Sequence, residues 1–262
     1  MIIVNDNDGV RDISTMVGPP ILKLPIHFYQ VDDLLIDTGS FTMAKQGEEY
    51  LTGSGIRCAA ITHIHEDHAG MASFIDMNLG VPVYLKEEDH AEAGMRSSIP
   101  FYRKMVWGNR GAFKAQAMPR FLETEKHRIE VLDAPGHHPN HVVFHEKEMG
   151  WLFTGDLFVS TRQKVAFKDE NISDSIDTIK RMLKLDFDTI FCAHSGVKDR
   201  GKERFRQKLQ YFEDIQGQAL ELMQKGMDLR SATKTLFPKK DLWEIVSRGE
   251  WSAYRMVATA CV

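Results

Sequence analysis

The feature that most constrains this chain is the clustering of its histidines. Of 11 histidines, three lie within Thr62–His68, together with Asp67, and three more lie within Ala134–His141. The first group directly follows the apolar run Cys58–Ile61, which predicts a buried strand, and precedes a predicted helix. It therefore occupies the turn at the carboxyl end of a strand, where ligands commonly bind in α/β sheets. Because imidazole nitrogens and carboxylate oxygens suit zinc and other divalent transition metals, the sequence predicts a metal site in this turn.

The pattern on both sides of this turn predicts a mixed α/β fold. Apolar and β-branched runs predict strands at 21–30, 33–37, 57–62, 81–85, 128–132, 142–145, 151–154 and 189–193. Helical spacing of apolar residues predicts helices over 42–51, 69–78 and 173–185, and further helices over 202–225, 231–237, 242–247 and 253–260. We therefore expect one α/β domain over residues 1–200, with a helical extension over 201–262 packed on the same domain.

The segment 87–121 differs from its surroundings. Its composition is helical, but glycine and proline interrupt it repeatedly, and it contains few acidic residues after Glu92. We interpret it as a helical insertion that lies over one end of the sheet, with a solvated surface excursion as the alternative. Within it, Tyr102 and Arg103 are the candidate substrate contacts, and either Arg103 or Arg110 is the candidate contact for an anion. The candidate apolar lining consists of Phe101, Tyr102, Met105, Trp107 and Phe113.

Composition and charge exclude several classes of protein. The chain has 33 basic and 37 acidic residues, so its net charge of −4 gives no support for binding nucleic acid by bulk charge, although a local basic patch remains open. No apolar run is long enough to span a membrane, and the first residues do not resemble a signal peptide. Its three cysteines, Cys58, Cys192 and Cys261, are too far apart in sequence to form a closed disulfide framework. We therefore expect a reduced, cytoplasmic protein that acts on a small molecule.

Five motifs resemble, in the right order, those of the metallo-β-lactamase fold superfamily. The segment His63–His68 is similar to its His-x-His-x-Asp-His signature. The others are Asp33–Gly39, similar to a strand ending in Asp-Thr-Gly; Ala134–His141, similar to Thr-Pro-Gly-His-x-x-x-His; Phe153–Asp156, similar to Thr-Gly-Asp; and Ala193–Gly196, similar to Gly-His-Gly. The resemblance implies a four-layer αβ/βα sandwich, in which two mixed sheets face one another, helices lie outside, and metals bind at one edge.

The resemblance also implies a complete set of ligands for two metal ions. His63, His65 and His137 correspond to the ligands of the first ion, Asp67, His68 and His194 to those of the second, and Asp156 to the carboxylate that bridges them. Asp67 has a further implied role, to orient the attacking hydroxide or accept its proton. His141 matches a residue that supports the site through an outer hydrogen bond, whereas His138 is expected to point away. Two divalent ions are the expected cofactors: zinc first, with iron or manganese as alternatives.

The implied activity is that of a metal-dependent hydrolase, in which a dinuclear metal-bound hydroxide cleaves a small ester, thioester or lactone. Among the branches of the superfamily, the chain resembles glyoxalase II and the lactonases. Asp156 stands where true β-lactamases have cysteine or serine, and His65 stands where diiron flavoproteins have glutamate. A phosphodiesterase or ribonuclease of the same fold is the first alternative. An iron-dependent sulfur dioxygenase, which uses one metal and three ligands, is the second, and a binding module without catalysis is disfavoured by the complete ligand set.

Overall fold

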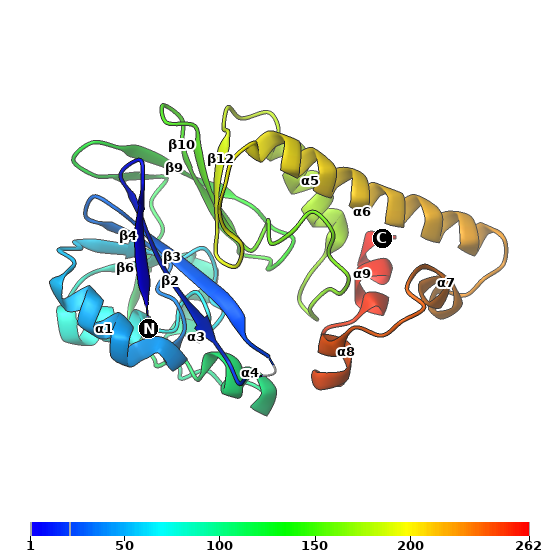
Figure 1. Cartoon of the computed structure of the whole chain (residues 1–262), viewed down its shortest axis with the longest axis horizontal. Coiled ribbons are helices and arrows are strands. Elements are labelled where there is room, and N and C mark those ends of the chain that lie inside the picture. The colour runs from blue at the N-terminus through cyan, green and yellow to red at the C-terminus, as the bar shows by residue number, and fades with distance from the viewer. Residues whose placement is uncertain (1, 21, 262) are drawn as a thin grey trace. The chain divides into compact units, whose positions relative to one another are not determined.

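A computed structural model describes residues 2–20 and 22–261 of the chain. The chain divides into two compact units that alternate along the sequence (Figure 1). The first unit consists of Met1–Asp133, Val142–Asp156 and Phe187–Asp199, and the second of Ala134–His141, Leu157–Asp186 and Arg200–Val262. The strands β1–β13 all belong to the first unit, and the helices α5–α9 belong to the second.

The first sheet has its strands in sequence order, from β1 to β7. Their bounds are β1 Ile3–Asn7, β2 Val10–Val17, β3 Leu24–Val31, β4 Leu34–Ile36, β5 Cys58–Ala60, β6 Val83–Leu85 and β7 Ala115–Ala117. The pairs from β1 to β4 are antiparallel, and those from β4 to β7 are parallel. The carboxyl ends of β4, β5 and β6 therefore meet at one edge of this sheet.

The second sheet has the order β13-β12-β11-β10-β9-β8. Its strands are β8 Phe121–Glu123, β9 Arg128–Asp133, β10 Val142–Glu146, β11 Trp151–Gly155, β12 Thr189–Cys192 and β13 Gly196–Lys198. Only the pair β11 and β12 is parallel; the remaining neighbours in this sheet are antiparallel. Both sheets thus contain parallel and antiparallel pairs, as the family resemblance implies.

The two sheets share one apolar core. Alternate residues of the strands of both sheets form a single buried cluster, which follows from the two-residue period of side chains along a strand. At its centre, the rings of Phe153 and Phe191 stack with centroids 4.5 Å apart, and Tyr29 meets both rings edge-on. The Tyr29 hydroxyl donates to the Cys192 carbonyl at 2.7 Å. This hydrogen bond ties β3 of the first sheet to the end of β12 in the second.

Short helices complete the first unit. They are η1 Phe41–Met43, α1 Ala44–Gly53, α2 Ala72–Phe74, the π-helix η2 Ile75–Leu79, η3 Glu87–Asp89, α3 His90–Ala93 and α4 Phe101–Trp107. The segment 87–121 therefore contains helices, as its composition predicts. It also contains β7, which pairs in parallel with β6 and extends the first sheet by one strand. The sequence did not predict this strand, because its three residues, Ala-Gln-Ala, carry little β-propensity of their own.

The second unit is helical. Its helices are α5 Ile172–Met182, α6 Gly201–Gln224, α7 Leu229–Leu236, α8 Leu242–Val246 and α9 Ala253–Ala260. Helix α6 contacts α5, α7 and α9. Within the described residues, no helix combines the length and the apolar character needed to cross a membrane.

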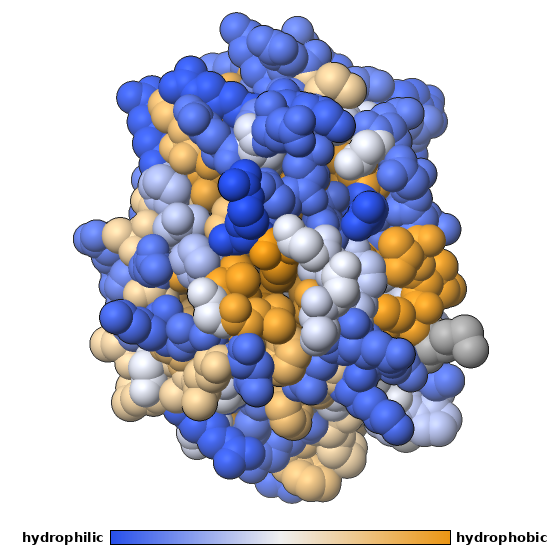
Figure 2. All heavy atoms as spheres, turned by 90° about the vertical axis from the view of Figure 1, so that its left-hand side faces the viewer, coloured by the Kyte–Doolittle hydropathy of each residue, from blue (hydrophilic) through white to orange (hydrophobic). Residues whose placement is uncertain are grey.

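One face of the molecule is shown in Figure 2. Hydrophilic atoms cover most of this face, and apolar atoms gather near its centre and at its right-hand edge. Among the exposed apolar side chains of the first unit are Phe101 and Met105, both on α4. Exposed apolar side chains are common on protein surfaces, so the exposure of these two residues alone does not indicate a binding site.

Candidate metal centre

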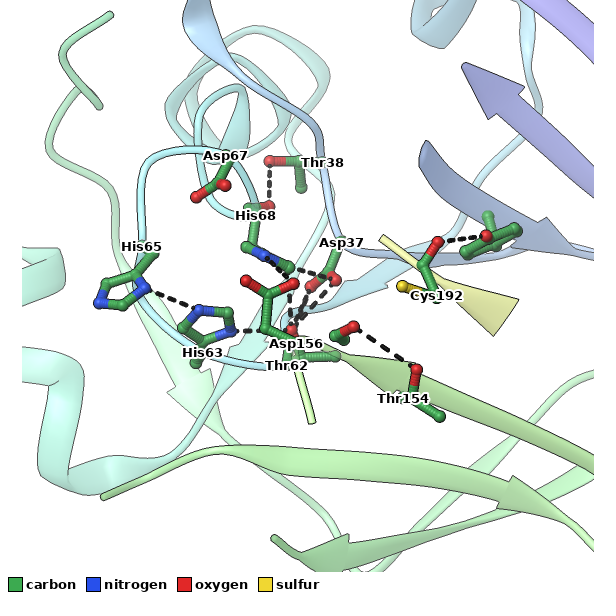
Figure 3. A network of polar contacts seen from close by, with 12 residues as sticks. Asp37, Thr38, Thr62, His63, His65, Asp67, His68, Thr154, Asp156 and Cys192 are labelled. Carbon is green, nitrogen blue, oxygen red and sulfur yellow. Dashed lines mark hydrogen bonds and ion pairs between the residues drawn. The ribbon is translucent and has the colours of Figure 1, made fainter. Parts of the chain in front are cut away.

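The loop that contains three of the clustered histidines begins directly beyond β5. Its first residue, Thr62, donates its backbone N–H to Asp37 Oδ1 at 2.8 Å, and its hydroxyl also contacts this carboxylate. Asp37 follows β4 and has a positive φ of 59°, a conformation that aspartate tolerates better than most residues. The two neighbouring parallel strands thus end in segments that hydrogen-bond to each other, and the loop 62–68, here called the metal loop, starts from a fixed position (Figure 3).

The other end of the metal loop is held just as firmly. Gly70 donates its N–H to the Gly39 carbonyl at 2.9 Å, and the Thr38 hydroxyl donates to the His68 carbonyl at the same distance. A Cβ atom on residue 70 would lie 2.6 Å from both the Glu66 and the Gly39 carbonyl oxygens. Only glycine fits there, because real Cβ atoms do not approach backbone so closely.

His68 is oriented by Asp37. Its Nδ1 lies 2.7 Å from Asp37 Oδ2, and its side chain is fully buried. The Nδ1–H group donates to this carboxylate, which leaves Nε2 as the ring atom available to a metal. That Nε2 atom makes no hydrogen bond among the described residues, and it lies 3.3 Å from Asp156 Oδ1. A buried ring nitrogen that makes no hydrogen bond could bind a metal ion.

Four side chains converge on that point. His194 Nε2 lies 3.2 Å from Asp67 Oδ2 and 3.3 Å from Asp156 Oδ1. Its other ring nitrogen, Nδ1, lies 3.0 Å from the Pro25 carbonyl, which can accept only if Nδ1 carries the proton. One atom each from Asp67, His68, Asp156 and His194 lies within 4.8 Å of every other. All four residues belong to the first unit, and we call them the donor cluster.

The donor cluster fits a divalent metal ion. Ligand atoms about 2.0–2.2 Å from a tetrahedral zinc ion lie roughly 3.3–3.5 Å from one another. The three closest separations in the cluster are 3.2–3.3 Å. Two nitrogens and two carboxylates are also a donor set that zinc accepts. Metals of similar size and preference, such as iron or manganese, suit the same donors.

The carboxylates of the donor cluster favour the protonated forms of its two histidines. Burial alone lowers the pKa of His68, but the carboxylates of Asp37, Asp156 and Asp67 outweigh it and raise this pKa well above its ordinary value. Burial and the carboxylates of Asp156 and Asp67 act on His194 in the same way, and its pKa is also raised well above its ordinary value. For Asp67, burial raises the pKa, but His68 and His194 together lower it. A metal ion would displace these protons, since ligating histidines must be neutral.

His63 and His65 lie together in the same loop. His63 Nε2 is 2.9 Å from His65 Nδ1, and the two rings meet edge-on with centroids 4.5 Å apart. The metal loop thus contains four of the seven predicted ligands, namely His63, His65, Asp67 and His68. The shared role of His63 and His65 as ligands of a first metal ion stays a prediction.

The remaining predicted histidines belong to the second unit. His137 and His141 lie in one turn, which the Ala134 N–H closes by donating to the His141 carbonyl at 2.8 Å, and their ring centroids are 6.3 Å apart. His138 Nδ1 accepts the Asn140 N–H at 3.3 Å. Three expectations stay predictions: His137 is a ligand, His141 supports the site through an outer hydrogen bond, and His138 points away from it.

The candidate substrate residues lie on α4. Tyr102 is buried, and Arg103 is only 6% exposed. The Arg103 guanidinium donates to Glu66 Oε2 at 2.5 Å and thus has an anionic partner within the protein. The substrate contacts expected of these two residues stay predictions.

Sequence reasoning missed two polar residues of the site. Asp37 lies in the Asp-Thr-Gly motif, but only the end of a strand was inferred from it, and not the carboxylate that orients His68. Glu66 occupies an x position of the His-x-His-x-Asp-His motif, which implies no role for it. Asp37 follows β4, which runs parallel to β5, the strand that leads into the metal loop, and a carboxylate in this position is a signal that identifies it. The partner of Glu66 lies 37 positions away and leaves no local signal.

Known proteins share the sequence pattern and the fold of this chain. The sequence model of the family described as the metallo-beta-lactamase superfamily matches residues 32–194, which is more than half of the chain and includes every predicted ligand. The chain belongs to the metallo-β-lactamase superfamily. The predicted family and its α/β fold with two sheets are thereby confirmed.

Two relatives are similar in sequence. A probable metallo-hydrolase, YybB, from Bacillus subtilis is 27% identical over 148 residues, which cover 54% of this chain and 66% of that protein. A hydroxyacylglutathione hydrolase, GloC, from Haemophilus influenzae is 26% identical over 162 residues, which cover 57% of this chain and 73% of that protein. The chain thus matches slightly less than two thirds of the length of the first relative.

Solved structures show the same fold. A metallo-beta-lactamase family protein from Thermus thermophilus matches with a TM-score of 0.70 at 20% identity, over 97% of this chain and 92% of that one. The metallo-beta-lactamase FIM-1 from Pseudomonas aeruginosa, solved in its mono-zinc form, matches with a TM-score of 0.62 at 18% identity, over 81% of this chain and 95% of that one. At such identities, these similarities establish the fold alone.

Proposed function

We propose that this protein is a metal-dependent hydrolase that uses two divalent metal ions to cleave a small ester, thioester or lactone. The observation that carries the proposal is the donor cluster, in which nitrogen and oxygen atoms of three buried residues and the partly buried His194 lie 3.2–3.3 Å apart, as ligands of one small cation do. Membership of a superfamily whose matched relatives are named as hydrolases supports the same conclusion.

The ligand assignment combines the donor cluster with the family motif. Asp67, His68 and His194 would hold one ion, and His63, His65 and His137 the other, with the Asp156 carboxylate shared between them. Two bound cations would lower the pKa of a water molecule towards neutrality and would polarise the oxygen of the scissile bond. No nucleophilic side chain is then required of the protein.

The residues of this chain supply orientation and proton transfer. Asp37 keeps the proton of His68 on Nδ1, and the Pro25 carbonyl does the same for His194, so that both Nε2 atoms face the cluster. The Asp67 carboxylate is buried beside these atoms and would orient the attacking water and accept its proton. Burial also excludes bulk water, which strengthens each of these charge interactions.

A thioester is the first substrate class to test, because one relative is named a hydroxyacylglutathione hydrolase. The four-membered donor cluster favours hydrolysis over the one-metal dioxygenase chemistry considered above, which needs only three ligands. Zinc is the metal we propose first, on the basis of the nitrogen and carboxylate donors and their spacing.

The proposal is tested by metal analysis and a substrate panel with the purified protein. We expect two zinc ions per chain and hydrolysis of thioesters, esters or lactones that is lost in the His68→Ala variant. One iron per chain with oxygen uptake would replace the proposal by a dioxygenase. Cleavage of bis-nitrophenyl phosphate alone would replace it by a phosphodiesterase. A protein that binds no metal would refute it.

A further inference from the structure

The metal loop contains one charged residue that the proposed reaction does not use. Glu66 lies between His65 and Asp67, and its side chain is 6% exposed. A buried carboxylate is costly unless a cation and hydrogen bonds compensate it, and here two ligand residues flank it in sequence. The position of Glu66 therefore requires an explanation.

Its partner is Arg103 of α4. Arg103 Nη2 lies 2.5 Å from Glu66 Oε2, and the two side chains are 7% and 6% exposed. The guanidinium also lies over the ring of Trp107, with 5.7 Å between Cζ and the ring centroid. A charge-assisted hydrogen bond between two buried, packed groups is both strong and strongly directional. It joins the metal loop to a helix that follows a different strand.

A second buried arginine in the same segment, Arg110, has different hydrogen-bond partners from Arg103. Arg110 is fully buried, and its guanidinium donates to the backbone carbonyls of Glu92, Ala93 and Met95. These carbonyls belong to the segment 87–121 itself. Arg110 thus holds the segment together, whereas Arg103 connects the segment to the metal loop.

We propose that Arg103 is a positioning residue for the metal site and acts through Glu66. The ion pair fixes the metal loop at Glu66, between its hydrogen-bonded ends at Thr62 and His68. The backbone on either side of Glu66 carries His65 and Asp67, so a fixed Glu66 determines where these side chains point. This inference rests on the proposed function, because it assumes that a metal binds at the donor cluster.

The test measures metal affinity rather than activity. Zinc affinity is determined by competition with a chromophoric chelator for Arg103→Met, Glu66→Gln, Arg103→Lys and the double variant Glu66→Gln/Arg103→Met. Unfolding of the metal-free protein is followed in parallel, and the spectrum of the cobalt-substituted protein reports the ligand geometry. Arg110→Met is the matched control, since Arg110 is also a buried guanidinium of this segment but donates its hydrogen bonds to the segment's own carbonyls.

We expect each single neutral variant to weaken zinc binding about 10- to 100-fold, as the loss of residues that orient ligands does. Because the pair acts as one unit, the double variant should weaken binding no more than either single change. It also leaves no buried charge unpaired, so it remains informative if a single variant fails to fold. Arg103→Lys should restore part of the affinity, since the ammonium keeps the charge but not the planar fork. Arg110→Met should lower thermal stability and leave affinity and the cobalt spectrum unchanged.

Two results would overturn the inference. One is a folded double variant with the affinity and cobalt spectrum of the unmodified protein. The other is an equal loss of affinity in Arg110→Met, which would attribute the effect to loosening of the whole segment. In both cases the unmodified protein still binds its metals, so the proposed function stands. If the unmodified protein binds no zinc at all, both proposals fail together.

Discussion

The metal loop and the segment 87–121 leave the first sheet at the same edge, since they follow the parallel strands β5 and β6, but they use their polar side chains in opposite ways. In the metal loop, imidazole and carboxylate groups turn towards one another and towards residues at the ends of other strands. In the segment 87–121, Arg110 turns inwards and binds backbone carbonyls. Side chains that converge on a point shared by several elements indicate chemistry, whereas side chains that satisfy their own backbone indicate scaffold.

The largest expected effect is that of removing the shared carboxylate. Asp156→Ala deletes a donor that lies 3.3 Å from both His68 Nε2 and His194 Nε2. We expect this variant to lose at least one metal ion per chain and to lose more activity than the roughly 10- to 100-fold typical of residues outside the ligand set. Metal content per chain and the rate on the best panel substrate measure this. Two tightly held ions in Asp156→Ala would contradict the bridging role. They would also weaken the distinction between the metal loop as the site of chemistry and the segment 87–121 as scaffold.

The next effect concerns a residue that orients a ligand without binding metal itself. Asp37→Asn keeps the size of the side chain but removes the charge that holds the proton on His68 Nδ1. We expect zinc affinity to fall about 10- to 100-fold. Asp12→Asn is the matched control, because Asp12 is also a buried carboxylate that binds a histidine, His27, at 2.8 Å. Equal affinities in the two variants would show that the Asp37 contact is not needed to position His68.

The two histidines of the donor cluster predict how the stability of the metal-free protein depends on pH. The pKa values of His68 and His194 are raised in the folded state, where burial opposes the shift and the carboxylates of the cluster outweigh it. A histidine whose pKa is about 6.5 when unfolded and higher when folded stabilises the protein fully below pH 6.5 and loses this contribution as the pH rises through the folded value. The melting temperature of the metal-free protein should therefore fall as the pH rises above about 6.5.

Bound metal should remove most of this dependence, because it takes the place of the protons. Arg110→Met should keep the slope of the metal-free protein, since its change lies in the segment 87–121 and leaves both histidines in place. Melting curves at several pH values are recorded for the metal-bound protein, for the metal-free protein in chelator and for metal-free Arg110→Met. A melting temperature that stays level or rises above pH 6.5 would show that the cluster is not protonated as described.

The two regions also differ in how far the sequence predicts them. The sequence predicts the candidate ligands of the metal loop one by one, because these residues are close in sequence and directly follow an apolar strand, and the structure brings Asp67 and His68 together with Asp156 and His194. The segment 87–121 was predicted only as helical. Strand β7 was missed because its pairing with β6 comes from the tertiary fold and not from its own residues. Arg103 was expected to contact a substrate, but the sequence does not reveal that Glu66, 37 positions earlier, occupies its guanidinium. Long-range pairs of this kind leave no local pattern.

The smallest expected effect tests whether the segment 87–121 also reaches the substrate. Met105 of α4 is 44% exposed and lines a cavity of about 520 Å³, together with residues of the β2–β3 turn and the start of α1. This cavity is also lined by Thr42 and Met43, which follow Phe41, and the Phe41 backbone nitrogen would lie 2.5 Å from a Cβ atom on Gly70, just beyond the metal loop. Thioether side chains adapt to apolar groups of different shape, so we expect the cavity to accept the apolar part of a substrate.

Met105→Ala should then raise KM for substrates with an apolar acyl chain and leave kcat and metal content unchanged. A loss of roughly 40–50 Å² of apolar contact corresponds to about 1 kcal/mol, or about a fivefold change in KM. Met77→Ala, which truncates an exposed methionine of η2, is the control. Because Met105 is solvent-exposed and contributes no charge to the donor cluster, a change in metal content would point to disturbance of Arg103, two residues away. Identical KM values for Met105→Ala and the unmodified protein across acyl chains of increasing length would leave α4 with the single role of holding the metal loop through Glu66.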